Sequence, residues 1–310
     1  MHSVWKKRCK YLLALLALLI GLWLVFFYLP ALVYYVLQQQ KAPVSDALGL
    51  RDYKVTVEAK AVQGIRQNLS GLTFHPESKT LFGIANAPSR VVEMTTDGEV
   101  LRIIRVRGGK DTEGITHLHH DQFMIVDEKT NALWQVEIAK DTKVIHLDEA
   151  PHAQLSLNPL YKNLGVEALA WNARDKTLWV GQEKWPMRVM EIACELPMEG
   201  GQSGNGKIKL HAQREWIAQG AMGWLLSDLA SITTLDNSSN LLFLGQESGV
   251  VVEYTRDGDA VGILPLWGGL HGLQDGIEQA EGIAVDPQGN IYLVAEPNLF
   301  YRFEKRRPAP

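Results

Sequence analysis

The stretch EGIAVDPQGNIYLVAE, residues 281–296, carries the pattern that decides the fold. It begins with a short apolar run at residues 283–285 and continues with the turn formers Asp, Pro, Gly and Asn at residues 286–290. Residues 291–294 are β-branched, aromatic or aliphatic. Turn formers between two such runs predict an antiparallel β-hairpin. Glu281 stands at the head of this hairpin and Glu296 follows it, so a carboxylate lies at each end.

The hairpin pattern occurs five times along the chain. Its other copies are SGLTFHPESKTLFGIAN from Ser70, EGITHLHHDQFMIVDE from Glu113, EALAWNARDKTLWVGQE from Glu167 and SITTLDNSSNLLFLGQE from Ser231. The copies start 43, 54, 64 and 50 residues apart, a spacing typical of β-propeller blades. A third strand follows each hairpin, and Asp-Gly pairs at residues 97–98 and 257–258 predict turns into a fourth. A β-sandwich does not repeat a four-stranded unit in this way.

The last repeat ends after three strands, near residue 303. The segment YKVTVEAKAV, residues 53–62, predicts the missing fourth strand, which closes the ring without an exposed edge. We therefore predict an all-β fold, a five-bladed β-propeller over residues 53–304, with residues 41–52 as a linker and 305–310 as a tail. A six-bladed ring is the alternative, because the long inserts before Glu167 and Ser231 have room for another blade.

The first forty residues differ in composition from the rest. Four basic residues, Lys6, Lys7, Arg8 and Lys10, precede an uncharged apolar run over residues 11–37 that is long enough to cross a bilayer as a helix. The basic flank predicts a cytoplasmic amino terminus. We therefore expect residues 1–40 to form a basic tail and one transmembrane signal-anchor in the bacterial inner membrane, with the propeller in the periplasm. A cleaved signal peptide is the alternative.

Charge and cysteine content exclude some functions of the outer domain. The chain has a net charge of −4, and residues 1–40 hold four positive and no negative charges, so the remainder carries −8. This sign argues against nucleic-acid binding and is compatible with cation binding. Cys194 is the only cysteine beyond the first forty residues, so the outer domain has no internal disulfide.

The head residues of the repeats predict a metal site. The first strand of each propeller blade lines the central channel, so Glu113, Glu167 and Glu281 converge with Ser70 and Ser231 at one mouth. Three carboxylates in one channel repel one another, so the ring needs a compensating cation, raised pKa values or many waters. Many oxygen ligands at loose spacing favour Ca²⁺. The alternative is that each glutamate caps backbone N–H groups at a strand start.

Further residues lie near this mouth by their position in the chain. The segments that lead into Glu167 and Glu281 bring Tyr161, His271 and Asp275 toward it, where they are candidates to shape a pocket. A second acidic set follows the second strands and is expected to face solvent or to bond neighbouring loops; its members are Glu128, Glu183, Glu247 and Glu296. The run HLHHD, residues 117–121, lies at the far end of its hairpin and matches no zinc signature.

The anchor, the EGI and EAL strand heads and the DGE turn resemble the SdiA-regulated family of bacterial proteins, and more distantly the NHL and gluconolactonase-type propellers. The resemblance implies a five-bladed propeller that binds calcium and has no established activity. In gluconolactonase-like enzymes, acidic or amide residues just before the strand-one glycine hold the metal. Carried over, these positions are Glu113, Glu281 and, before Ala168, Glu167. The chain departs from that pattern at Ser70 and Ser231.

Together these features predict a membrane-anchored, extracytoplasmic, calcium-binding propeller that presents loops to an unknown protein or small-molecule partner. The alternative is a metal-dependent hydrolase of lactones or esters, in which Ca²⁺ polarises a carbonyl and His271 or Asp275 acts as the base. A scaffold without metal is the third interpretation.

Overall fold

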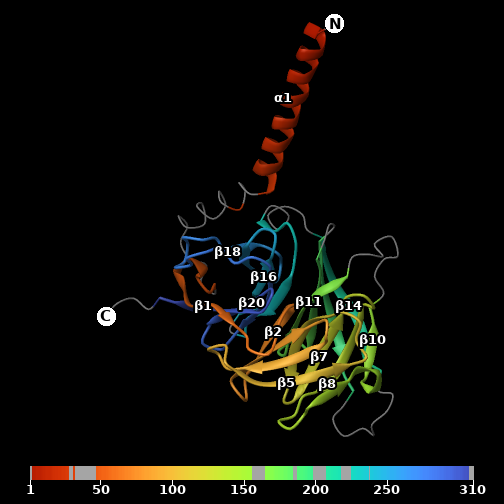
Figure 1. The fold of residues 1–310 in the computed structure, drawn as a ribbon. Helices are drawn as coiled ribbons and strands as arrows, with labels where there is room; N and C mark the ends of the chain where they lie inside the picture. Colours follow the sequence, from red (N-terminus) through yellow and green to blue (C-terminus); the bar gives the residue numbers. More distant parts are fainter. Residues whose placement is uncertain are drawn as a thin grey trace.

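The computed structural model describes residues 2–27, 31, 47–155, 165–183, 187–197, 207–217, 225–236 and 238–306. It contains an amino-terminal helix, α1 (His2–Phe27), and two short 3-10 helices, η1 (Leu50–Asp52) and η2 (Leu147–Glu149). The remaining elements are β-strands, which form five sheets around a common centre (Figure 1).

Each sheet is one blade of a propeller, and its strands follow one another from the channel outward. Blade 1 contains β2 (Leu69–His75), β3 (Thr80–Ala85), β4 (Arg90–Met94) and β5 (Val100–Arg107), and blade 2 contains β6 (Thr112–His119), β7 (Gln122–Asp127), β8 (Ala132–Glu137) and β10 (His152–Gln154). Blade 3 contains β11 (Val166–Asn172), β12 (Thr177–Gln182), β13 (Arg188–Glu195) and β14 (Lys209–Ile217), and blade 4 contains β15 (Ser231–Thr234), β16 (Leu241–Gly245), β17 (Val250–Tyr254) and β18 (Ala260–Pro265). Blade 5 contains β19 (Ala280–Val285), β20 (Ile291–Ala295), β21 (Leu299–Lys305) and β1 (Tyr53–Ala61). The innermost strands contact one another in chain order, and β19 contacts β2. The five-bladed prediction is confirmed.

Blade 5 closes the ring by joining both ends of the propeller. Strand β1 pairs antiparallel with β21, with Tyr53 opposite Lys305 and Ala61 opposite Leu299. Asn298 strengthens the junction, because its side-chain amide donates to the carbonyl oxygens of Val62 and Ile65 at 3.3 and 2.7 Å. This pairing confirms the prediction that residues 53–62 supply the fourth strand of the last blade.

Blade 1 has a fifth strand that the repeat pattern did not predict. Strand β9 (Val144–His146) comes from the chain of blade 2 and pairs in parallel with β5 of blade 1. The buried side chains of Ile145 and Leu147 pack into the same cluster as Phe82 and Phe123 of the two blades. A three-residue strand shows too little alternation to be recognised in a sequence.

The hydrophobic core lies between neighbouring blades. Between blades 3 and 4, Trp216 contacts Trp179 of its own blade edge to face and Phe243 of blade 4 at a tilt, with ring centroids 5.2 and 6.1 Å apart. Phe82 and Phe123 make the corresponding contact between blades 1 and 2, at 4.7 Å. Complete burial of one such side chain stabilises the fold by about 1.5–3 kcal/mol, so the contacts between sheets hold the ring together.

Charged side chains on the third strands also join blades. Glu191 of β13 is 2% exposed and accepts a hydrogen bond from Arg256 of blade 4. In blade 1, Glu93 of β4 pairs with Arg102, which also donates to the carbonyl oxygen of Ala139 in blade 2 at 2.7 Å. Glu191 and Glu93 therefore each hold an arginine that links two neighbouring blades.

The amino-terminal prediction is only partly covered by the structure. Residues 28–30, 32–40 and the linker residues 41–46 lie outside the described residues. Among the parts of the chain that are described, no helix is both long enough and apolar enough to cross a membrane. The transmembrane helix stays a prediction.

Candidate metal centre

The predicted head residues all lie at the start of the innermost strands. Ser70, Glu113, Glu167 and Glu281 are each the second residue of their strand, and Ser231 is the first of β15. At the first four positions the pairing with the next strand is interrupted by a register shift, whereas Ser231 pairs regularly with Leu244. A bulge leaves a residue unpaired and redirects its side chain. The bulges therefore release these head side chains from the regular alternation.

Small residues after the heads allow the inner strands to approach closely. A Cβ atom added to Gly114 would lie 2.6 Å from the carbonyl oxygen of Glu167, and one added to Gly71 would lie 2.7 Å from that of Glu113. Gly282 makes the same kind of contact with the backbone of Ser70. Backbone therefore lies against backbone around the channel, and the head residues of successive blades come together.

Burial and mutual repulsion raise the pKa values of the three glutamates. Burial raises the pKa of Glu281 to about 8, with further contributions from the charges of Glu296 and Glu113. Burial is also the main cause of the raised pKa of Glu167, followed by the charge of Glu183. We call the end of the channel where these carboxylates interact the acidic mouth. In the absence of a cation, these raised pKa values favour the protonated forms of Glu167 and Glu281 at neutral pH.

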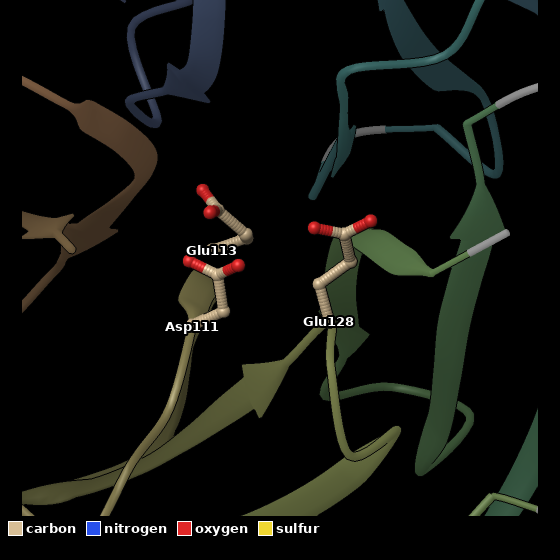
Figure 2. Close-up of side chains that lie close together, drawn as sticks. All are labelled: Asp111, Glu113 and Glu128. Carbon is tan, nitrogen blue, oxygen red and sulfur yellow. The ribbon is translucent and has the colours of Figure 1, made fainter. Parts of the chain in front are cut away.

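The tightest carboxylate cluster at the acidic mouth lies in blade 2. One ligand atom each from Asp111, Glu113 and Glu128 lies within 4.8 Å of the other two. Figure 2 shows Asp111 and Glu113 together, with Glu128 across from them. Asp111 precedes β6 and Glu128 follows β7, so the cluster is built at one end of a single hairpin. Lys129 pairs with Asp111 at 2.7 Å and offsets part of the charge.

Asp127 shapes the loop that carries Asp111. It is fully buried, and its Oδ2 accepts the backbone N–H groups of Lys110 and Asp111, both at 2.6 Å. Although burial favours the neutral acid, these hydrogen bonds and two from Thr130 lower the pKa of Asp127. The backbone N–H of Glu128 donates to the carbonyl oxygen of Asp111 at 2.9 Å. These hydrogen bonds to the backbone fix the positions of Asp111 and Glu128 without a bound ligand.

Asn86 adds an amide oxygen beside this cluster. It directly follows β3 of blade 1, at the position where other repeats have a closing carboxylate, and it is 7% exposed. Its Nδ2 donates to Glu113 Oε1, while its Oδ1 is buried and has no hydrogen-bond partner among the described residues. Burial raises the pKa of Glu113, and hydrogen bonds from Ser70 and Asn86 oppose the rise. A buried amide oxygen without a donor is the contact that a bound cation satisfies.

Two predicted pocket residues, His271 and Asp275, are not brought to the acidic mouth. His271 lies against the outermost strand of blade 5, where its Nδ1 meets the carbonyl oxygen of Tyr53 at 2.8 Å. Asp275 is exposed, and its backbone N–H points to Glu58 on the same strand at 3.4 Å. The loop before β19 therefore folds along the outer strand and not across the channel. Tyr161 lies outside the described residues.

Ser231 and the second acidic set have different surroundings. The Oγ of Ser231 accepts the backbone N–H of Ile283 at 3.3 Å, so this serine links β15 to β19. In the second acidic set, Glu128 is a member of the carboxylate cluster, while Glu247 is exposed. The repeat pattern does not indicate Asp111, because no acidic residue recurs at its position in the other repeats. For Glu128 the pattern does offer a signal, since a carboxylate closes four of the five hairpins.

The HLHHD run lies at the opposite mouth, which contains a cavity of about 300 Å³. The Nε2 atoms of His75 and His117 both approach the carbonyl oxygen of His120, at 2.9 and 2.8 Å. Burial lowers the pKa of His117 to about 4, so its imidazole is neutral and donates to that oxygen. These histidines fasten the β6–β7 turn to blade 1.

Among the described residues, the candidate metal ligands at the acidic mouth are oxygen atoms. They comprise the carboxylates of the cluster, the amide oxygen of Asn86 and the ring carboxylates of Glu167 and Glu281. Such a donor set suits a hard cation, which also neutralises charges that burial otherwise disfavours.

Comparisons with known proteins place this architecture among propellers. Glutaminyl cyclase from Myxococcus xanthus is similar over 81% of this chain and 95% of its own, with 12% identity and a TM-score of 0.53. A luciferin-regenerating enzyme covers 80% of this chain and 95% of its own, with 10% identity and a TM-score of 0.49. Regucalcin from Agrobacterium tumefaciens, described as a calcium-binding protein, covers 81% and 96%, with 11% identity and a TM-score of 0.48.

These likenesses concern the fold. The family model described as SdiA-regulated matches residues 45–304, which include all of the propeller except the last residue of β21. The chain therefore belongs to the SdiA-regulated family.

Proposed function

We propose that the propeller binds Ca²⁺ at the acidic mouth, with Asp111, Glu113 and Glu128 as carboxylate ligands. The observation that carries this proposal is the convergence of the three carboxylates beside the buried, unpartnered oxygen of Asn86. Glu167 and Glu281 complete the negative field of the site.

The donor set favours Ca²⁺ over other divalent ions. No cysteine or histidine belongs to the cluster within the described residues, which argues against zinc. Mg²⁺ requires close to ideal octahedral geometry at short distances, whereas Ca²⁺ accepts six to eight oxygens at longer ones. Rigid strand ends that hold oxygens at loose spacing suit the larger ion.

Thermal unfolding of the full-length chain tests the calcium site. A ligand at one hundred times its dissociation constant stabilises the folded state by about 2.7 kcal/mol. For a domain of this size, that raises the midpoint by about 5–10 °C. We expect this rise with CaCl₂ after EDTA treatment, and a much smaller rise with MgCl₂.

Matched variants separate a metal ligand from a strand cap. Glu113→Gln is expected to lose most of the calcium-induced rise, yet to be at least as stable as wild type in EDTA, because it removes a buried charge. Glu137→Gln, on the exposed end of β8, is the control and keeps the full response. A wild-type midpoint that ignores Ca²⁺, with Glu113→Gln destabilised in EDTA, contradicts the proposal and supports capping.

We further propose that residues 11–37 anchor the propeller in a bacterial inner membrane, with the propeller outside the cytoplasm. The support is the sequence: an uncharged apolar run behind a cluster of four basic residues. In this arrangement the propeller presents its loops to a protein or small molecule at the membrane surface.

Fractionation of bacterial cells tests the anchor. The full-length chain is expected to stay in the membrane pellet after alkaline carbonate extraction, and its propeller to be digested by protease added to spheroplasts. A variant without residues 1–40 serves as the control. Recovery of the full-length chain in the soluble fraction, or protection from protease, contradicts the proposed topology.

The hydrolase alternative loses its candidate bases, because His271 and Asp275 lie at the outer edge of blade 5. We therefore propose a binding function for the metal centre, not a catalytic one.

A further inference from the structure

A hollow of about 840 Å³ lies beside the acidic mouth. One wall is the connection from β1 to β2, residues 63–67, and the other is the turn after β3, residues 85–88, with Arg90. Asn86 belongs to the second wall, the turn after β3, and also donates to Glu113 Oε1, so it joins the hollow to the metal centre.

The lining of the hollow differs in charge from the mouth next to it. It carries the guanidinium groups of Arg66 and Arg90 and the carboxamides of Gln63 and Gln67, and none of its described lining residues is acidic. Arg90 Nη1 contacts the carbonyl oxygen of Gly64 across the hollow at 3.3 Å. Two arginines and several amide donors are the groups with which proteins bind carboxylate and phosphate.

The walls are held in place by the fold. Ile65 is 4% exposed and anchors the first wall in the core, and the side-chain amide of Asn298 holds its carbonyl oxygen at 2.7 Å. The second wall is tied to the first, because the backbone N–H of Asn86 donates to the carbonyl oxygen of Asn68 at 3.1 Å. Preformed walls reduce the entropy that a ligand loses on binding.

We propose that this hollow binds a small molecule through a carboxylate or phosphate group. Arg66 and Arg90 bind the oxyanion from one side, and the cation at the acidic mouth lies on the other side of Asn86. The metal's contribution rests on the calcium site proposed above, whereas the arginine contacts do not depend on it.

Isothermal titration of the full-length chain tests this site with three probes that share one carbon skeleton. Glucose 6-phosphate and gluconate carry the two oxyanions, and glucose is the neutral control. Each is titrated in CaCl₂ and in EDTA. We expect at least one of the oxyanions to bind, glucose not to bind, and CaCl₂ to tighten the binding.

The variant Arg66→Gln/Arg90→Gln is expected to lose oxyanion affinity at least tenfold while keeping the calcium response of its thermal midpoint. Arg105→Gln, which changes an exposed arginine of β5, is the matched control and keeps wild-type affinity. The proposal is overturned if neither oxyanion binds to wild type, if the double variant binds as tightly, or if the control loses as much.

The same experiment separates the two proposals. Loss of the calcium response in wild type, with oxyanion binding still dependent on the two arginines, overturns only the metal centre. An intact calcium response without oxyanion binding overturns only the hollow.

Discussion

Gly114 occupies a close approach between two inner strands, and it shows how the site depends on single residues. Its position lies between the carbonyl oxygen of Glu167 and the side chain of Val126, with no room for a Cβ atom. The residue directly before it is Glu113. The glycine therefore sets the distance between successive head residues as well as the packing of the ring.

Gly114→Ala is expected to destabilise the protein by about 1–3 kcal/mol, because overpacking forces the backbone to shift. The added Cβ would meet the oxygen of Glu167 at 2.6 Å and Val126 Cγ1 at 2.7 Å. Urea denaturation of the full-length chain measures the change. Gly262→Ala is the control, since its nearest atom is 3.6 Å away, and equal stability losses in the two variants contradict the argument.

At the scale of elements, the strands of a blade are joined by backbone pairing and the blades by side chains. Glu191 and Arg256 form such a link between blades 3 and 4, and the arginine also pairs with Asp175 at 3.0 Å. The carboxylate is 2% exposed, so the hydrogen bond from this arginine offsets part of the cost of burying it. The more exposed pair of Arg214 and Asp257 joins the same two blades at 2.9 Å.

Arg256→Ala is expected to cost about 2–3 kcal/mol of unfolding free energy, because it leaves the Glu191 carboxylate buried without its strongest donor. Arg214→Ala is expected to cost less than about 1 kcal/mol, since exposed pairs contribute little. Denaturant titration of both variants measures the difference. Adding Glu191→Gln to Arg256→Ala is expected to recover part of the loss, and failure to do so contradicts a charge effect.

At the scale of the whole molecule, five blades place several carboxylates around one narrow axis. Each blade contributes a strand head, and the ring glutamates raise one another's pKa values in addition to the effect of burial. The acidic mouth therefore titrates as a unit formed by several blades. No blade produces this field by itself.

The metal-free protein is expected to lose stability as pH rises. The pKa of Glu281 is raised from 4.5 in its ordinary state to about 8 in the fold, so the folded state holds a proton that the unfolded state releases. The stabilisation is complete below about pH 4.5 and is lost as pH rises through 8. Raised pKa values of Glu113 and Glu167 act in the same direction.

Thermal midpoints in EDTA between pH 5 and 9 measure this effect. They are expected to fall over that range, and CaCl₂ is expected to reduce the slope, since the metal replaces the protons. Glu281→Gln is expected to flatten the curve in EDTA. A midpoint in EDTA that rises from pH 5 to 8 contradicts the burial of these carboxylates.

The sequence by itself determined the hairpin repeat, the number of blades, the closure by residues 53–62 and the placement of the head residues at one mouth. These features follow from local patterns: alternating strands, Asp-Gly turns and a polar residue before a small one. They need no knowledge of which strand lies beside which.

Only the tertiary structure decided how the acidic mouth is assembled. Asp111 and Glu128 meet Glu113 because Asp127 and a backbone hydrogen bond fold two loops together, and His271 turns to the outer strand because Tyr53 offers it a carbonyl oxygen. The strand β9 likewise leaves the chain of blade 2 and joins the sheet of blade 1. These outcomes depend on contacts outside the repeated strand pairing, and such contacts leave no periodic signal in a sequence.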